Sequence, residues 1–499
     1  MAWIQEGLAQ LSQRNTAVTV IAALTISYFI GSAFYNLFLH PLRKYPGPKL
    51  WAMSRIPFSL AYIQGDAHHR MLKLHEKYGE VVRIAPDELI FCYPEAFTHI
   101  MGHRKRGEEE NGKDPAFWRE DAITLTGSNG ERHRRVRRIL SHAFSAQAMA
   151  EQQPLIKQYV NLLIDRLKEV AEGGQPQEMT GWYNWTTFDI IGDLAYGDPF
   201  GCLENSSYHP WIRLIFKHLN GMAINNSVSK FPLARFLLKL FTPKRIAQDV
   251  EQHHEFNKAK VAKRLSVKEP RPDFMQCMIT AREKNLISHE EIVANSHLLI
   301  VGGSETTATV LSGVTYLLAK HKDILQKLRA EVKSRFNSEE EIDLLSVQSL
   351  DYMMAVLKEA MRLYPAVPSA IPRLTPPGGT TIRGEYVPGN TVLGIWPWAM
   401  FHSPKHFREP EKMIPERWLN DPKFDGDAKG ALQPFSVGAR DCIGKNLAYA
   451  EMRLILARLA WNFDLELDSR SEGWLEKNVM KFMWDKPQLY VRLVPLNKA

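Results

Sequence analysis

The stretch PFSVGARDCIGKNLAYAEMRLILARL, from Pro434 to Leu459, is the most informative part of the chain. It places Cys442 between two glycines and directly before a helix that we expect from about Lys445 to Trp461. Backbone amides and the dipole at the start of a helix favour a thiolate and lower the pKa of a cysteine. A lone cysteine is usually a small buried hydrophobe. Here the neighbours favour a ligand or a nucleophile.

Four residues around the cysteine support that interpretation. Gly438 and Gly444 allow the backbone to pass close to something large and flat. Arg440 offers a fork of donors suited to a carboxylate, and Phe435 can shield the sulfur from water. The loop therefore indicates a binding site.

Composition describes a large folded chain. Its 499 residues are 45% hydrophobic and 24% charged, which is neither a disordered nor a fibrous composition. The four cysteines are scattered without C-x-x-C spacing, so neither a disulfide framework nor a zinc site is predicted. A net charge of +8 would suit an acidic partner, an anionic membrane or nucleic acid, and a solvated mixed-charge surface explains it equally well.

The N-terminus is predicted to be a membrane anchor. No Asp, Glu, Lys or Arg lies between Arg14 and Arg43, whereas a membrane-spanning helix needs about 20 apolar residues and a signal-peptide core about 7–15. Arg43 and Lys44 follow the span, so the rest of the chain is expected on the cytoplasmic side. Proline punctuation up to Pro48 argues against a buried core helix. Residues 1–45 are interpreted as anchor and hinge.

The remaining chain shows neither repeats nor an obvious linker. Residues 79–91 alternate like a hairpin with Pro86 near its turn, and residues 380–396 offer another short strand pair. Long amphipathic helical patterns fill most of the rest. The sequence therefore predicts a mainly α fold with small β-sheets.

One expected helix, running to about His321, carries unusual residues in its middle. Ser288 and Glu291 form a capping box at its start, and Gly302 and Gly303 interrupt it before a Ser-Glu-Thr-Thr run. Close helix packing would explain the glycines alone. A groove beside a bound cofactor, with an acid and a hydroxyl to pass protons, explains all of these residue types.

A second helix ending at Pro365 holds Glu359 and Arg362 on one face. Such pairs usually lie on a solvated surface, but the apolar neighbours suggest burial, and Arg417 in a proline-framed loop would complete an ionic cluster. A buried cluster of this kind fixes geometry more than it stabilises.

These elements together resemble the cytochrome P-450 family. Phe435, Gly438, Arg440, Cys442 and Gly444 match its heme-binding signature F-x-x-G-x-R-x-C-x-G. Residues 302–307 resemble its oxygen-binding groove, Glu359-x-x-Arg362 its E-x-x-R motif, and residues 415–418 its PERF-like loop. The resemblance implies a cytochrome P-450 fold preceded by one transmembrane helix, with residues 46–499 as a single heme-thiolate domain.

The resemblance also implies roles for individual residues. Cys442 would be the axial ligand of the heme iron, and Thr306 and Glu305 would carry protons into the oxygen-binding groove. The heme propionates would pair with Arg440, Arg373 and Arg137. His133 stands where many members have Trp, and Glu305 where some have Asp. The remaining members of the heme site would be Phe435, Gly438 and Gly444, and a structural cluster would comprise Glu359, Arg362 and Arg417.

The activity implied is that of a monooxygenase with heme b, using O2 and electrons from NADPH. The implied partners are an NADPH-cytochrome reductase, with cytochrome b5 as an optional second donor, and the endoplasmic reticulum membrane; no nucleic acid is expected. The substrate would be a hydrophobic small molecule contacting residues about 114–129, 296–305 and 367–371 and the stretches near Phe231 and Phe482.

Phrases such as DIIGDLAYGDPFGCLEN are similar to fungal secondary-metabolite oxygenases of the trichothecene hydroxylase type. This similarity favours a tailoring step on a terpenoid, polyketide or alkaloid. Oxidative coupling, ring closure or rearrangement without net oxygen insertion is the alternative, and a membrane-tethered heme carrier or sensor is a remote one.

Overall fold

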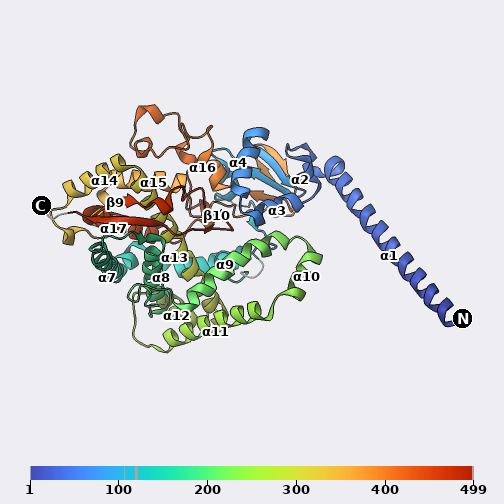
Figure 1. The fold of residues 1–499 in the computed structure, drawn as a ribbon, viewed down its shortest axis with the longest axis horizontal. Coiled ribbons are helices and arrows are strands. Elements are labelled where there is room, and N and C mark those ends of the chain that lie inside the picture. The colour runs from blue at the N-terminus through green and yellow to red at the C-terminus, as the bar shows by residue number, and fades with distance from the viewer. Residues whose placement is uncertain (1, 106, 119–121, 497–499) are drawn as a thin grey trace.

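The computed structural model describes residues 2–105, 107–118 and 122–496. A long N-terminal helix, α1 (Ala2–Phe34), projects from a body made of helices and small sheets (Figure 1). The predicted fold class, mainly α with small β-sheets and one N-terminal apolar helix, is confirmed.

The helices of the body have the following bounds: α2 Lys49–Met53, α3 Ile56–Gln64, α4 Ala67–Tyr78, α5 Ala96–Met101, α6 Gly130–Ser141, α7 Ala146–Ala171, α8 Met179–Tyr196, α9 Pro210–Val228, α10 Pro232–Phe241, α11 Lys244–Ser266, α12 Phe274–Glu283, α13 His289–Lys320, α14 Lys322–Arg335, α15 Asp351–Leu363, α16 Pro397–His402 and α17 Lys445–Asn462. The strands are β1 Val81–Ala85, β2 Glu88–Phe91, β3 Gly112–Lys113, β4 Gln177–Glu178, β5 Arg373–Leu374, β6 Thr380–Ile382, β7 Glu385–Val387, β8 Val392–Gly394, β9 Phe463–Leu467, β10 Val479–Met480, β11 Trp484–Asp485 and β12 Tyr490–Pro495.

The N-terminal helix contains a candidate membrane span. Val18–Leu39 covers 22 residues with a mean hydropathy of 1.7, and none of its most apolar window is buried inside the protein. An exposed apolar helix of this length is unfavourable in water and matches the thickness of a bilayer. The helix is therefore consistent with the predicted anchor.

The largest sheet has five strands in the order β1-β2-β8-β5-β3. The predicted hairpin is present, with β1 and β2 antiparallel around the Pro86 turn. Of the strands expected in residues 380–396, β6 and β7 pair with each other, but β8 is fully buried and joins β2 and β5 instead. The antiparallel pairing of β3 with β5 sets Lys113 opposite Arg373.

Helix α13 runs through the middle of the body and packs against α8, α15 and α17 (Figure 1). Its predicted capping box is present, because the Glu291 amide donates to Ser288 Oγ at 3.2 Å and the Ser288 amide donates to Glu291 Oε2 at 3.0 Å. The ends of α15 and α17 lie within about two residues of the predicted ones. The three helices that carry the expected motifs therefore share one core.

The C-terminal strands lie against this core. Strand β12 pairs with β4 on one side and β9 on the other, and β9 packs on α13. The short hairpin β10–β11 precedes β12. This arrangement brings the residues between β11 and β12 to the side of α13.

Candidate active site around Cys442

The loop before α17 has a shape that its glycines make possible. The Cys442 amide donates to the Phe435 carbonyl at 2.8 Å. Gly438 has a φ of 82°, and a Cβ there would lie 2.2 Å from the carbonyl oxygen of Met101. A Cβ on Gly444 would lie 4.0 Å from Cys442 Sγ. A side chain at Gly438 would therefore collide with fixed backbone and displace the loop.

Cys442 borders a space inside the protein. Its side chain is accessible, yet the surrounding protein raises the pKa of the thiol by burial. The Gly444 amide and the charges of Arg137 and Lys445 act in the opposite direction, and Asp441 raises the pKa further. The expectation of a lowered pKa is therefore wrong for the free thiol, because desolvation outweighs the helix end.

A cluster of basic side chains lies beside this loop. Lys113 and Arg373 face each other across β3 and β5, and Arg440 lies close enough to lower the pKa values of both and that of His133, in addition to the larger effect of burial. Burial and the Arg440 charge lower the pKa of Arg373 to about 9 and that of His133 to about 4. Burial, Arg373 and Arg440 lower the pKa of Lys113 well below its usual value. We call Lys113, Arg373 and Arg440 the cationic cluster; His133, whose pKa of about 4 leaves it neutral near pH 7, lies beside them.

Several donor atoms of the cationic cluster have no acceptor within the described chain. Arg440 donates to the Ser128 carbonyl at 2.7 Å and to Glu110 Oε1 at 2.8 Å, but its Nε has no partner within the described chain. Arg373 is 2% exposed, and its Nε and Nη1 likewise have none there. Unpaired buried donors and like charges side by side are costly. Such a cluster is suited to bind a carboxylate-bearing ligand.

Arg137, another predicted propionate partner, contacts the residue next to Cys442. Its guanidinium donates to the Asp441 carbonyl at 2.8 Å and forms an ion pair with the Asp441 carboxylate. Its contact with a propionate stays a prediction. The observed contacts fasten α6 to the residue that precedes Cys442.

The two glycines of α13 face different surroundings. A Cβ on Gly303 would lie 2.6 Å from Ile191 Cδ1 of α8, whereas a Cβ on Gly302 would meet nothing within 4 Å. Gly302 is exposed and Thr306 half-buried in a helix that is otherwise mostly buried. The Thr306 hydroxyl donates to the Gly302 carbonyl at 2.7 Å. Close packing therefore explains Gly303, and the open space beside Gly302 is consistent with the predicted groove.

Comparison with known proteins identifies the family of this chain. The cytochrome P450 family matches residues 46–493. The chain belongs to the cytochrome P450 family. It is 44% identical to trichothecene C-15 hydroxylase of Fusarium sporotrichioides, over 94% of this chain and 96% of that one. It is 43% identical to averantin hydroxylase of Dothistroma septosporum, over 96% and 91% of the two chains. Cytochrome P450 monooxygenase astA of Talaromyces wortmannii is 42% identical over 97% of this chain and 98% of its own.

The chain is thus a P450 monooxygenase related to fungal secondary-metabolite enzymes, and its family implies a heme-thiolate cofactor. The residues present fit that group. An accessible cysteine lies beside a cationic cluster whose buried donors lack acceptors, and heme offers one iron for a thiolate and two carboxylates for such donors.

Lys113 and its neighbour Glu110 were not predicted, because a two-residue strand leaves no periodic signal in the sequence.

Glu305, the predicted acid of this P450, is buried beside the groove. It is 3% exposed and forms an ion pair with Lys486, which also donates to Thr309 Oγ1 at 2.9 Å. Its role in carrying protons stays a prediction. Lys486 comes from the segment between β11 and β12, nearly two hundred residues away, and the sequence pattern gave no sign of the contact.

The structure brings the predicted ionic cluster together. Arg362 donates to both carboxylate oxygens of Glu359 at 2.9 and 3.0 Å, and Arg417 donates to Oε1 at 3.0 Å. All three side chains are 0% exposed. Trp418 Nε1 adds a bond to Glu359 at 2.9 Å, and Asp427, which the sequence did not point to, pairs with Arg417. The alternative that Glu359 and Arg362 lie on a solvated surface is therefore wrong.

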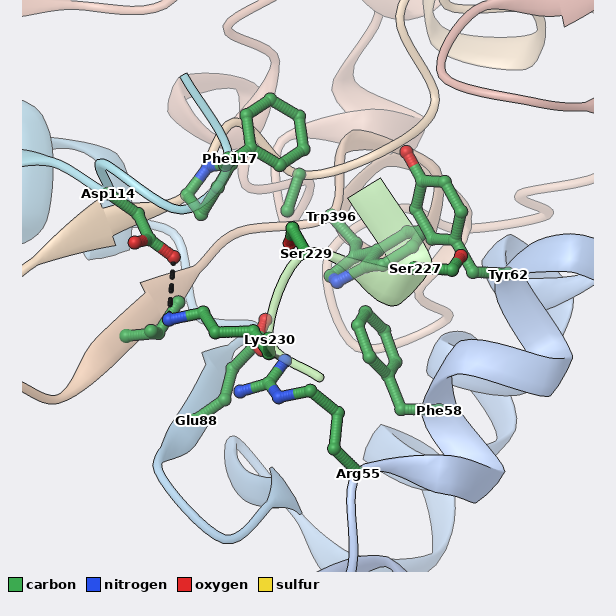
Figure 2. A pocket seen from close by; sticks show the side chains of 13 residues that line it. Arg55, Phe58, Tyr62, Glu88, Asp114, Phe117, Ser227, Ser229, Lys230 and Trp396 are labelled. Carbon is green, nitrogen blue, oxygen red and sulfur yellow. Dashed lines mark hydrogen bonds and ion pairs between the residues drawn. The ribbon is translucent and has the colours of Figure 1, made fainter. Parts of the chain in front are cut away.

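Figure 2 shows a pocket of the same P450, and none of the residues that line it belongs to the Cys442 loop. It holds about 50 Å³, room for water-sized molecules. Lys230, from the connection between α9 and α10, reaches Asp114 at 3.0 Å across it. Phe117 also lines the pocket, and its ring lies 5.7 Å from that of Phe482. Three of the predicted substrate-contact segments therefore have residues in the lining, Phe117, Lys230 next to Phe231, and Ala370, whereas residues 296–305 are not part of it. Their contact with a substrate stays a prediction.

Proposed function

We propose that this P450 uses O2 and electrons from NADPH to insert oxygen into a hydrophobic small molecule, as a tailoring step of fungal secondary metabolism. The observation that carries the proposal is the groove of α13, where accessible Gly302 and Thr306 adjoin a buried acid, Glu305. A heme carrier or sensor needs no acid and hydroxyl at such a place. Two similar proteins are named hydroxylases, which favours oxygen insertion.

Bound heme supplies the activation of oxygen. The residues of this chain would bind the heme and move protons. Cys442 would bind the iron through its sulfur, and the cationic cluster would hold the propionates and so fix the heme plane. The Thr306 hydroxyl, now donating to the Gly302 carbonyl, would hold and pass a proton at Oγ1. Glu305 would resupply that proton.

The substrate is proposed to be an apolar terpenoid, polyketide or alkaloid. Phe117, Trp118 and Phe482 form an aromatic group in the expected contact region, with ring centroids 5.0 to 6.5 Å apart. Aromatic walls suit such scaffolds. Helices α3 and α10 carry exposed large apolar side chains. Both helices lie on the side of the body from which α1 projects (Figure 1), which supports arrival of the substrate from a membrane.

The electron donor is proposed to be an NADPH-cytochrome reductase at the cytoplasmic face of the endoplasmic reticulum, with cytochrome b5 as an optional second donor. Arg134, Arg138 and Lys445 are exposed on the elements that flank Cys442. Arg137 fastens α6, which carries two of them, to the Cys442 loop. A basic face near the sulfur suits an acidic reductase.

The test uses membranes that contain the full chain and a fungal reductase, supplied with a panel of terpenoids, polyketides and alkaloids under ¹⁸O2. The expected result is NADPH consumption that rises with one compound and a product carrying one ¹⁸O atom. A product without the label would instead support coupling or ring closure. NADPH consumption that no compound raises, in membranes showing the thiolate-type carbon monoxide spectrum, would contradict the enzyme proposal. Cys442→Ala membranes are the control.

A further inference from the structure

The buried acid of the α13 groove is held by a lysine from the C-terminal segment of the chain. One carboxylate oxygen of Glu305, Oε1, contacts the ammonium of Lys486, and the two side chains are 5% and 4% exposed. The other oxygen, Oε2, is buried and has no hydrogen-bond partner within the described chain. Within the described chain, the Glu305 carboxylate is therefore held at Oε1 by an ion pair and is not held at Oε2.

The fold holds Lys486 from both directions. Before it, the Trp484 indole donates to the Pro365 carbonyl at 2.8 Å. After it, the Leu489 amide donates to Glu178 Oε1 at 3.1 Å, and β12 begins. Asp485 is exposed, so the backbone is at the surface while the lysine side chain runs inward to α13. The ammonium is thus placed by two fixed elements rather than by a mobile loop end.

The electrostatic consequence concerns the charge of Glu305. A carboxylate buried among apolar and phenolic groups is unfavourable unless a cation compensates it. Tyr364 and Tyr208 lie close enough that the Glu305 charge raises their pKa values, although burial is the larger cause for both. Without Lys486, the buried Glu305 would take up a proton. An acid that holds its proton permanently cannot resupply Thr306.

We propose that Lys486 is the positioning residue of Glu305. Its ammonium stabilises the carboxylate form of the buried acid and fixes it at Oε1, which leaves Oε2 as the oxygen that takes up a solvent-derived proton and releases it to the side of Thr306. This inference rests on the proposed proton role of Glu305 but concerns a different residue. The segment between β11 and β12 would thus position the acid that supplies Thr306 with protons.

Difference infrared spectroscopy of the heme-loaded protein at neutral pH tests the inference without a substrate. Lys486→Met should show one additional protonated-carboxyl band, and that band should be lost in the double variant Lys486→Met/Glu305→Gln. Lys486→Arg, which keeps the charge, should lack the band. Glu451, whose pKa burial raises to about 8, supplies a one-carboxyl intensity standard that Glu451→Gln identifies. A Lys486→Met spectrum equal to that of the parent protein would overturn the inference.

Carbon monoxide bound to the reduced protein separates this inference from the proposed function. Its stretching frequency reports the electric field in the groove, so it should shift in Glu305→Gln and shift in Lys486→Met, and return towards the parent value in Lys486→Arg. No shift in Glu305→Gln would remove Glu305 from the groove and contradict the proposed proton role. A shift in Glu305→Gln with none in Lys486→Met would contradict the role of Lys486 alone.

Discussion

Neutralising Glu359 should destabilise the protein far more than neutralising Glu416, which lies in the PERW segment Pro415–Trp418. Glu359→Gln keeps the side-chain size but removes the charge that balances Arg362 and Arg417, both 0% exposed. Removing one partner of a buried ion pair costs about 3–5 kcal/mol. Asp427 still pairs with Arg417, so we expect the lower end, about 3 kcal/mol.

Glu416→Gln is the matched control. Glu416 pairs with Lys327 at 2.7 Å, but the side chains are 31% and 55% exposed, and such pairs contribute about 0–1 kcal/mol. An unfolding entropy of about 2.1 cal/mol/K per residue makes 1 kcal/mol equal to about 1 °C in a chain of this size. Thermal unfolding should therefore show a fall of about 3 °C for Glu359→Gln and less than about 1 °C for Glu416→Gln. Equal falls would refute the compensation argument.

Three further predictions follow from the site. Thr306→Ala should divert NADPH electrons from product to peroxide, lowering product per NADPH by about tenfold or more; unchanged coupling, measured with a substrate from the ¹⁸O2 screen, would count against Oγ1 as a proton carrier. Arg373→Met should speed heme transfer to apomyoglobin by about tenfold, since one charge-assisted bond is lost, whereas exposed Arg134→Met should not; equal rates would exclude Arg373 from propionate binding. Glu451 has its pKa raised to about 8 by burial, so its stabilising contribution is complete below about pH 4.5 and is lost as pH rises through 8. Thermal scans should show the parent protein losing up to about 1.4 kcal/mol per pH unit relative to Glu451→Gln in that window, and parallel pH profiles would contradict the assignment.

Local chemistry could be predicted from the sequence. The capping box at Ser288, the hairpin around Pro86 and the glycine-dependent loop before Cys442 depend on residues a few positions apart, and each is present. The family signature also follows from closely spaced residues. Because these features depend on residues that are close together in the sequence, they can be predicted from the sequence alone.

Contacts between distant segments could not be predicted. Lys113 meets Arg373 through a two-residue pairing, and Lys486 meets Glu305 across the C-terminal segment. The different surroundings of the α13 glycines depend on Ile191, which a helix pattern cannot place. The Cys442 pKa was misjudged for the same reason, because burial depends on the whole fold.

The ferrous carbon monoxide difference spectrum of membranes containing the full chain tests the heme-thiolate assignment most directly. The account predicts a Soret maximum at the red-shifted position typical of thiolate ligation, and its loss in Cys442→Ala. A maximum at the position typical of histidine ligation, or a red-shifted maximum that survives Cys442→Ala, would contradict it.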